Sequence, residues 1–264
     1  MPDTYTHGHH ESVLRSHRNR TVENSAAYLI PHLAPGLAVL DVGCGPGTIS
    51  ADLARRVAPG PVIAVDYAPD AIAAAVADFA GVANLTFAVG DGYALDFPDA
   101  SFDVVHAHQV LQHLTDPVAA LREWKRVLKP GGVLAARDSI YSSKNWYPAD
   151  PMLDRWLELY HQLTDRNDAE DDAGIFLPHW ANEAGFDDVT FSGSMWAYAD
   201  PASREWWGGL WADRALKSSF AAQSLEYGLT TQEELEEIAA AWKRWAAHPT
   251  SSFVVVHGEI VARA

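Results

Sequence analysis

A glycine-rich turn that follows an acidic residue has the composition of a ligand-binding loop. Asp41 lies in the apolar run 38–42. The glycines that follow it, ahead of a segment with helical periodicity, are Gly43, Gly45 and Gly47. Glycines at a strand-to-helix turn let the backbone approach a ligand closely, near the positive end of the helix. Asp41 would repel a pyrophosphate but would suit an ammonium or sulfonium group. The loop is therefore expected to bind a ligand that carries positive charge.

Two further acidic residues follow the next two apolar runs. Asp66 ends the run 62–66, at a position where folds of this kind hold a ribose through its hydroxyl groups. Asp91 follows the run 84–89 and could accept a hydrogen bond from an exocyclic amine. With Asp41, three carboxylates at successive strand ends match a ligand that has cationic, ribose and adenine parts.

The elements that must position these residues alternate between strand and helix. This order predicts an α/β fold with a doubly wound, mostly parallel sheet and helices on both faces. Strands are expected at 38–42, 62–66, 84–89, 102–106 and 133–137, and helices at 22–32, 48–57, 69–80 and 117–128. Beyond residue 139 we expect a helix at 151–164, one that ends at 179–184, a strand at 189–198, a helical insertion at 201–247 and a last strand at 253–261.

Charge and cysteine content exclude several classes of function. The chain has 264 residues with 19 basic and 35 acidic side chains, a net charge of −16. An acidic chain gains no counterion release from nucleic acid, so neither nucleic acid nor an anionic membrane is an expected partner. Cys44 is the only cysteine, which excludes an intrachain disulfide and a cysteine-based zinc site. No apolar signal core and no run of ~18 apolar residues occurs, which predicts a cytoplasmic protein.

Five segments of the sequence carry a joint signal, namely VLDVGCGPG (39–47), AVD (64–66), GD (90–91), FPDASFDVVHAHQVLQHL (97–114) and LREWKRVLKPGGVL (121–134). In combination they resemble the class I S-adenosylmethionine-dependent methyltransferases, most closely the UbiE-like small-molecule group. The resemblance implies S-adenosylmethionine as cofactor and a Rossmann-like sheet of about seven strands with the last one antiparallel. We interpret residues 1–264 as one domain, with an N-terminal helical lid (1–35), a cofactor half (36–140) and a substrate half (141–264) that carries a helical cap near 201–247.

The resemblance also implies roles for individual residues. The loop glycines would line the methionine portion, Asp66 would bind the ribose, and Asp91 with Gly92 would meet the adenine. The backbone of Ala107, after the fourth strand, would face the sulfonium, and Arg20 or His17 could pair with the cofactor carboxylate. The expected cofactor contacts are Asp41, Gly43, Gly45, Gly47, Asp66, Tyr67, Asp91, Gly92, Ala107 and Arg20.

Histidines and aromatic residues are the candidates for the acceptor side. His106, His108 and His113 follow the fourth strand, and a histidine there can accept a proton near pH 7. His113 is our candidate general base, with polar packing or a substrate hydrogen bond as the alternative. The spacing of these histidines matches no metal-ligand rule, and the N-terminal His7, His9 and His10 are interpreted as part of the lid, so no metal is expected. Contacts to a small-molecule acceptor are expected from His108, Tyr141, Trp146 and Trp196.

Three other functions stay open at this point. An NAD-dependent oxidoreductase is disfavoured because the dinucleotide fingerprint needs glycine where Thr48 stands. A non-catalytic protein that binds the cofactor or its demethylated product would use the same loop. A methyltransferase for protein or nucleic acid is disfavoured by the net charge and by the sequence 106–109, which lacks an Asn-Pro-Pro-Tyr-like motif. The acceptor atom and the oligomeric state are not indicated.

Overall fold

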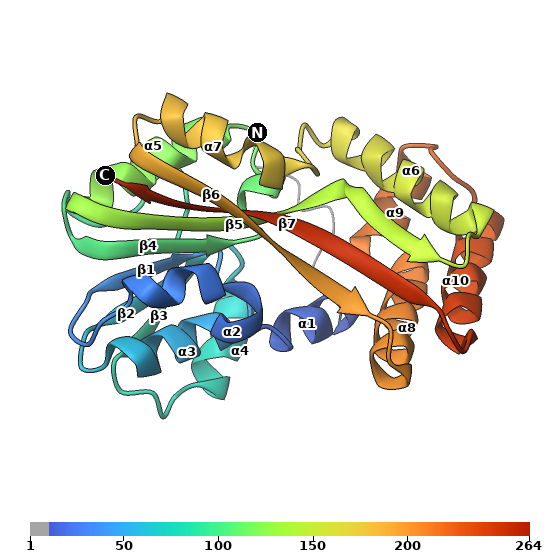
Figure 1. Cartoon of the computed structure of the whole chain (residues 1–264), viewed down its shortest axis with the longest axis horizontal. Coiled ribbons are helices and arrows are strands. Elements are labelled where there is room, and N and C mark those ends of the chain that lie inside the picture. Colours follow the sequence, from blue (N-terminus) through green and yellow to red (C-terminus); the bar gives the residue numbers. More distant parts are fainter. Residues whose placement is uncertain (1–10) are drawn as a thin grey trace.

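A seven-stranded mixed sheet organises the computed structural model, which describes residues 11–264 (Figure 1). The strand order is β3-β2-β1-β4-β5-β7-β6, and β7 runs antiparallel to both of its neighbours. The predicted Rossmann-like sheet with an antiparallel last strand is therefore confirmed. The strands are β1 (Val39–Val42), β2 (Val62–Asp66), β3 (Leu85–Val89), β4 (Phe102–His108), β5 (Leu128–Tyr147), β6 (Asp187–Tyr198) and β7 (Ser252–Arg263).

Helices cover both faces of this sheet. One buried cluster joins α3 and the N-terminal helices to the sheet through residues such as Leu29 and Leu53. The opposite cluster joins α5 and α7 to the sheet around Trp124 and Leu177. The helices of this part are α2 (Val22–Ser25), η1 (Ala27–His32), α3 (Thr48–Val57), α4 (Pro69–Asp78), η2 (Leu111–His113), α5 (Pro117–Val127) and α7 (Ala173–Glu183).

Two elements differ clearly in kind or length from the sequence expectation, beside smaller shifts in the bounds of others. The helix expected at 22–32 is divided into α2 and η1, because Ala26 between them has non-helical angles (φ −142°, ψ 28°). The strand expected at 133–137 is only the middle of β5. β5 pairs with β7 along most of its length, and this long partner stabilises an extended backbone beyond the local apolar pattern.

A helical layer packs at the far end of the long strands β5, β6 and β7 (Figure 1). It consists of α6 (Pro151–Arg166), α8 (Pro201–Lys217), α9 (Ser219–Glu226) and α10 (Gln232–Ala247). Asp-Pro pairs begin both α6 and α8, and the side chains of Asp150 and Asp200 accept hydrogen bonds from backbone N–H groups of the first turn. The tryptophans of this layer mostly form its own core, where Trp156 lies edge-on to Trp211 and Trp242.

The described N-terminal helix, α1 (Glu11–Arg18), lies against α8. Arg15 forms an ion pair with Asp213 at 3.0 Å, and the guanidinium of Arg214 donates a hydrogen bond to the hydroxyl of Ser16. This contact ties the predicted lid to the helical layer. His7, His9 and His10 lie outside the described residues. Within residues 11–264, no helix is long and apolar enough to cross a membrane, and no group of three or more His, Cys, Asp or Glu residues could hold a metal ion.

Candidate functional site

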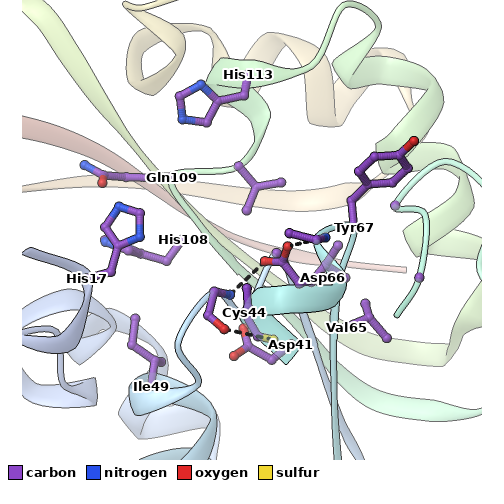
Figure 2. A pocket seen from close by; sticks show the side chains of 18 of the residues that line it. His17, Asp41, Cys44, Ile49, Val65, Asp66, Tyr67, His108, Gln109 and His113 are labelled. Carbon is purple, nitrogen blue, oxygen red and sulfur yellow. Dashed lines mark hydrogen bonds between the residues drawn. The ribbon is translucent and has the colours of Figure 1, made fainter. Parts of the chain in front are cut away.

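A cavity of about 380 Å³ opens where β1, β2, β3 and β4 end, at the carboxyl edge of the parallel strands (Figure 2). We call it the first cavity. This edge, where the strand order reverses next to β1, is where open α/β sheets bind ligands. Most of the predicted site residues line it, namely Arg20, Asp41, Gly43, Gly45, Asp66, Tyr67, Asp91, Gly92, His108 and His113.

The three loop glycines are required for different reasons. All have positive φ, between +52° and +78°, which side-chain-bearing residues rarely adopt. A Cβ on Gly43 would lie 2.4 Å from a methyl carbon of Val110, and one on Gly47 would lie 2.6 Å from the ring of Phe87. Gly45 faces space instead, with its nearest such contact at 3.8 Å. Gly47 does not line the cavity, so it acts through the turn that begins α3, whereas Gly45 leaves room for a ligand.

Asp66 joins the glycine loop to the end of β2. Its carboxylate accepts hydrogen bonds from the backbone N–H of Gly45 at 2.8 Å and from that of Ala68 at 2.9 Å (Figure 2). A carboxylate has about four lone-pair positions, so both oxygens can still accept from ligand hydroxyl groups. Asp66 therefore fixes the loop and presents acceptors to the cavity at the same time.

Asp41 and Asp91 have contrasting surroundings. Asp41 is only 3% exposed, and its oxygens accept hydrogen bonds from Nδ1 of His106 at 2.7 Å and from the hydroxyl of Ser50 at 2.5 Å. Its carboxyl group is therefore fixed next to the loop, and both of its oxygens already have protein partners. Asp91 is exposed, and one of its oxygens accepts from the N–H of Tyr93 at 2.9 Å.

The residue that follows β4 is not the one we expected. Ala107 is a fully buried residue of β4 and does not line the first cavity, because the strand continues to His108. The next residue, Gln109, has φ of +55°. Its side chain accepts a hydrogen bond from Arg20 and lies 3.0 Å from Nε2 of His257. No local pattern indicated Gln109, because its partners come from the N-terminal segment and from β7.

A second cavity of about 280 Å³ adjoins the first. His17, Arg20 and Gln109 line both cavities and form the boundary between them. Of the predicted acceptor contacts, Tyr141 and Trp196 line the second cavity. Trp146 lines neither, because its ring stacks on Phe253 in the core of the helical layer, with centroids 5.8 Å apart. Sequence reasoning missed several lining residues that only the long strands and α8 bring here, among them Lys144, Tyr198 and Arg214.

Two histidines of the first cavity, His108 and His113, have lowered pKa values. Burial and then the charge of Arg20 lower the pKa of His113 to about 3. The same two causes lower the pKa of His108 well below its usual range, and neither of its ring nitrogens has a hydrogen-bond partner among the described residues. A base with a pKa of about 3 takes a proton from a hydroxyl group poorly. This favours the alternative interpretation of a hydrogen bond to a ligand, and the role of His113 stays a prediction.

Asp138, beside this site in β5, gives a prediction for the pH dependence of stability. Its carboxyl is fully buried and accepts from the N–H of Gln112 at 3.3 Å, while its Oδ2 has no partner in the described chain. Burial raises its pKa to about 8. An unfolded aspartate has a pKa of about 3.9, so the folded state binds the extra proton between these values and loses stability as pH rises through this window.

Asp138→Asn removes this titration while keeping the acceptor oxygen for Gln112. We expect the free energy of unfolding of the natural chain, relative to the variant, to fall by up to about 1.4 kcal/mol per pH unit between pH 5 and 8. Urea unfolding at several pH values measures this difference. Parallel pH curves for the two proteins would contradict the prediction.

The fold and the site together define a class I S-adenosylmethionine-dependent methyltransferase, and the comparisons agree. Residues 40–136 match the model of a protein family described as a methyltransferase domain. An uncharacterized methyltransferase of Schizosaccharomyces pombe is 32% identical to this chain, covering 97% of it and 95% of the yeast protein. The chain belongs to this family of methyltransferases.

Two other proteins resemble parts of the chain. The 2-methyl-6-phytyl-1,4-hydroquinone methyltransferase of Synechocystis is 40% identical over 40% of this chain and 33% of its own length. A phosphoethanolamine N-methyltransferase of Haemonchus contortus, solved with S-adenosylhomocysteine, has the same fold, with a TM-score of 0.53 and 19% identity. That match covers 88% of this chain and 49% of the Haemonchus chain.

Proposed function

We propose that this enzyme transfers a methyl group from S-adenosylmethionine, bound in the first cavity, to a small-molecule acceptor bound in the second. The observation that carries the proposal is the shared boundary of the two cavities at His17, Arg20 and Gln109. A donor and an acceptor that occupy the two spaces would meet at this boundary.

S-adenosylmethionine supplies a methyl group already activated on a sulfonium, so the chain mainly has to orient the partners and exclude water. Asp66 and the glycine loop would hold the ribose and methionine portions, and Asp41 would oppose the sulfonium charge from below. Arg20 would pair with the cofactor carboxylate at the boundary. An acceptor nucleophile would attack the methyl carbon in line while the carbon–sulfur bond breaks, so that S-adenosylhomocysteine and, from an acceptor with an X–H group, one proton are released.

The size and character of the second cavity support a small, partly aromatic acceptor. Trp196 forms one wall, and it is held by a hydrogen bond from its Nε1 to the backbone oxygen of Asn24 at 2.8 Å. The guanidinium of Arg137 lies 4.7 Å from the centre of its ring. The Synechocystis relative acts, by its name, on a phytyl-substituted hydroquinone, so its acceptor also contains an aromatic ring.

A substitution that fills the second cavity tests this arrangement. Ala197, on β6, lines the second cavity, so Ala197→Trp should block the acceptor without touching the first cavity. We expect transfer of labelled methyl from S-adenosylmethionine into the small-molecule fraction of a cell extract to fall by at least tenfold, with cofactor affinity unchanged within about twofold.

Thr190→Trp provides the matched control, since Thr190 is an exposed residue of the same strand that lines neither cavity. It should keep full transfer. Label in the protein or nucleic-acid fraction would contradict a small-molecule acceptor. Cofactor binding without transfer into any fraction would instead favour a protein that only senses the cofactor.

A further inference from the structure

The ionisable side chains in the described lining of the second cavity include basic residues and no acidic ones. Its described lining includes the basic side chains of Arg20, Lys144 and Arg214, and none of those lining residues is aspartate or glutamate. This is notable in a chain whose net charge is −16. The chain as a whole has more acidic than basic residues, whereas this cavity has only basic ones among its described lining. This difference favours a negatively charged ligand.

Lys144 is the most unusual of these groups. It is only 6% exposed, forms no ion pair with any described carboxylate, and lies over the ring of Tyr141. The ring centres of Trp156 and Trp211 lie 5.4 Å and 5.8 Å from its Nζ. Aromatic faces stabilise a cation only partly, and a buried ammonium without a counter-ion is costly. Burial accordingly lowers the pKa of Lys144 well below its usual range.

The acids nearest to Lys144 are engaged elsewhere. Asp171 lies 2.6 Å from Nδ1 of His161 and accepts from the hydroxyl of Thr164 at 2.9 Å. Asp172 accepts from the backbone N–H of Ser142 at 2.8 Å. Among residues 11–264, no carboxylate forms an ion pair with Lys144, and the charges of Asp171 and Asp172 only partly offset the effect of burial on its pKa.

Arg214 adds a second buried cation on the opposite element, α8. It is 4% exposed, lies with its guanidinium 5.0 Å from the centre of the Trp211 ring, and lines the same cavity as Lys144. A carboxylate has two oxygens and is ionised at neutral pH without help, so it can accept from an ammonium and a guanidinium together. The indole walls around these cations suit a flat ring.

We propose that the methyl acceptor carries a carboxylate on an aromatic ring, and that Lys144 together with Arg214 binds this carboxylate in the second cavity. The inference rests on the proposed function and deepens it by naming the class of acceptor. Binding of the anion gives Lys144 a counter-ion, so the ammonium form is stabilised when the acceptor is present.

A pair of probes of equal shape tests the proposal. 2-Naphthoate and 2-naphthamide differ in charge but hardly in size, and their binding to the full chain is measured by titration calorimetry at saturating S-adenosylhomocysteine. We expect the carboxylate to bind at least tenfold more tightly than the amide. In Lys144→Met this ratio should fall to within about twofold of unity, and Lys144→Arg, which keeps the charge, should retain most of the preference.

Lys217→Met is the matched control, because Lys217 is an exposed residue of α8 that pairs with Asp213 and does not line the cavity. It should leave the ratio unchanged. Unchanged affinity for S-adenosylhomocysteine shows that each variant is folded. Equal binding of the two probes, no binding of either, or an unchanged ratio in Lys144→Met would overturn the proposal. Methyl transfer that Ala197→Trp abolishes would still stand in that case, so the two proposals fail separately.

Discussion

Replacing Asp66 by asparagine is expected to raise the dissociation constant for S-adenosylmethionine by about 100-fold or more. The substitution removes the charge and one acceptor oxygen while it keeps the volume. Hydrogen bonds to a charged group contribute about 1.5–3 kcal/mol each, and every 1.4 kcal/mol corresponds to a factor of ten in affinity. The effect is large because the same carboxylate holds the N–H of Gly45, so the loop loses its anchor together with the ribose contact.

Asp70→Asn is the matched control. Asp70 is an exposed residue in the first turn of α4, four positions along the chain, and it does not line the first cavity. Titration calorimetry with S-adenosylmethionine and S-adenosylhomocysteine should show nearly unchanged affinities for this control. Wild-type affinity in Asp66→Asn would mean that the ligand does not lie over the end of β2.

Replacing Gly258 by alanine is expected to destabilise the fold by about 3 kcal/mol or more. Gly258 lies in β7 where α7 crosses the sheet, and a Cβ there would lie 1.9 Å from the carbonyl oxygen of Gly174. Gly174 is itself closely packed on its other side, because a Cβ added to it would lie 2.5 Å from the carbonyl oxygen of Asp138. It therefore cannot move away from Gly258. Backbone atoms cannot rotate away as a side chain does, so α7 as a whole must shift.

Replacing Gly209 by alanine is expected to stabilise the fold rather than destabilise it. Gly209 is exposed in α8, and an added Cβ would meet no atom within 4 Å. Alanine there should raise the free energy of unfolding by about 0.5–1 kcal/mol through helix propensity. Urea unfolding of the two variants measures both changes, and a Gly258→Ala protein as stable as the natural chain would show that α7 does not pack on β7 at this point.

The cofactor half of the protein was predictable because its signals are local. The strand that ends at Asp66 and the helix 48–57 have bounds that the apolar periodicity and the glycines mark directly. Asp41, Gly45 and Asp66 lie in one cavity because parallel strands that share a sheet end at the same edge. The positions of these residues at strand ends were therefore enough to predict that they lie together in space.

The acceptor side was not predictable in the same way. Tryptophans at 146 and 196 have the same local chemistry, yet Trp146 packs on Phe253 while Trp196 forms a cavity wall. Ala107 was expected after the fourth strand, but pairing with β5 extends β4 through His108. Which side chain is buried in a core and which lines a space depends on neighbours that are distant in the sequence.

The sequence by itself determined the cofactor class and the strand ends that form the first cavity, because a strand, a glycine turn and an acid within a few residues constrain one another. Only the tertiary structure decided the second cavity. Lys144 comes from the long β5, Arg214 from α8 and Arg20 from the segment after α1, and no spacing rule links these three. They meet because β5 extends along β7 to the helical layer, which brings the buried side chain of Lys144 beside indole rings in a cavity whose lining, within residues 11–264, includes no aspartate or glutamate.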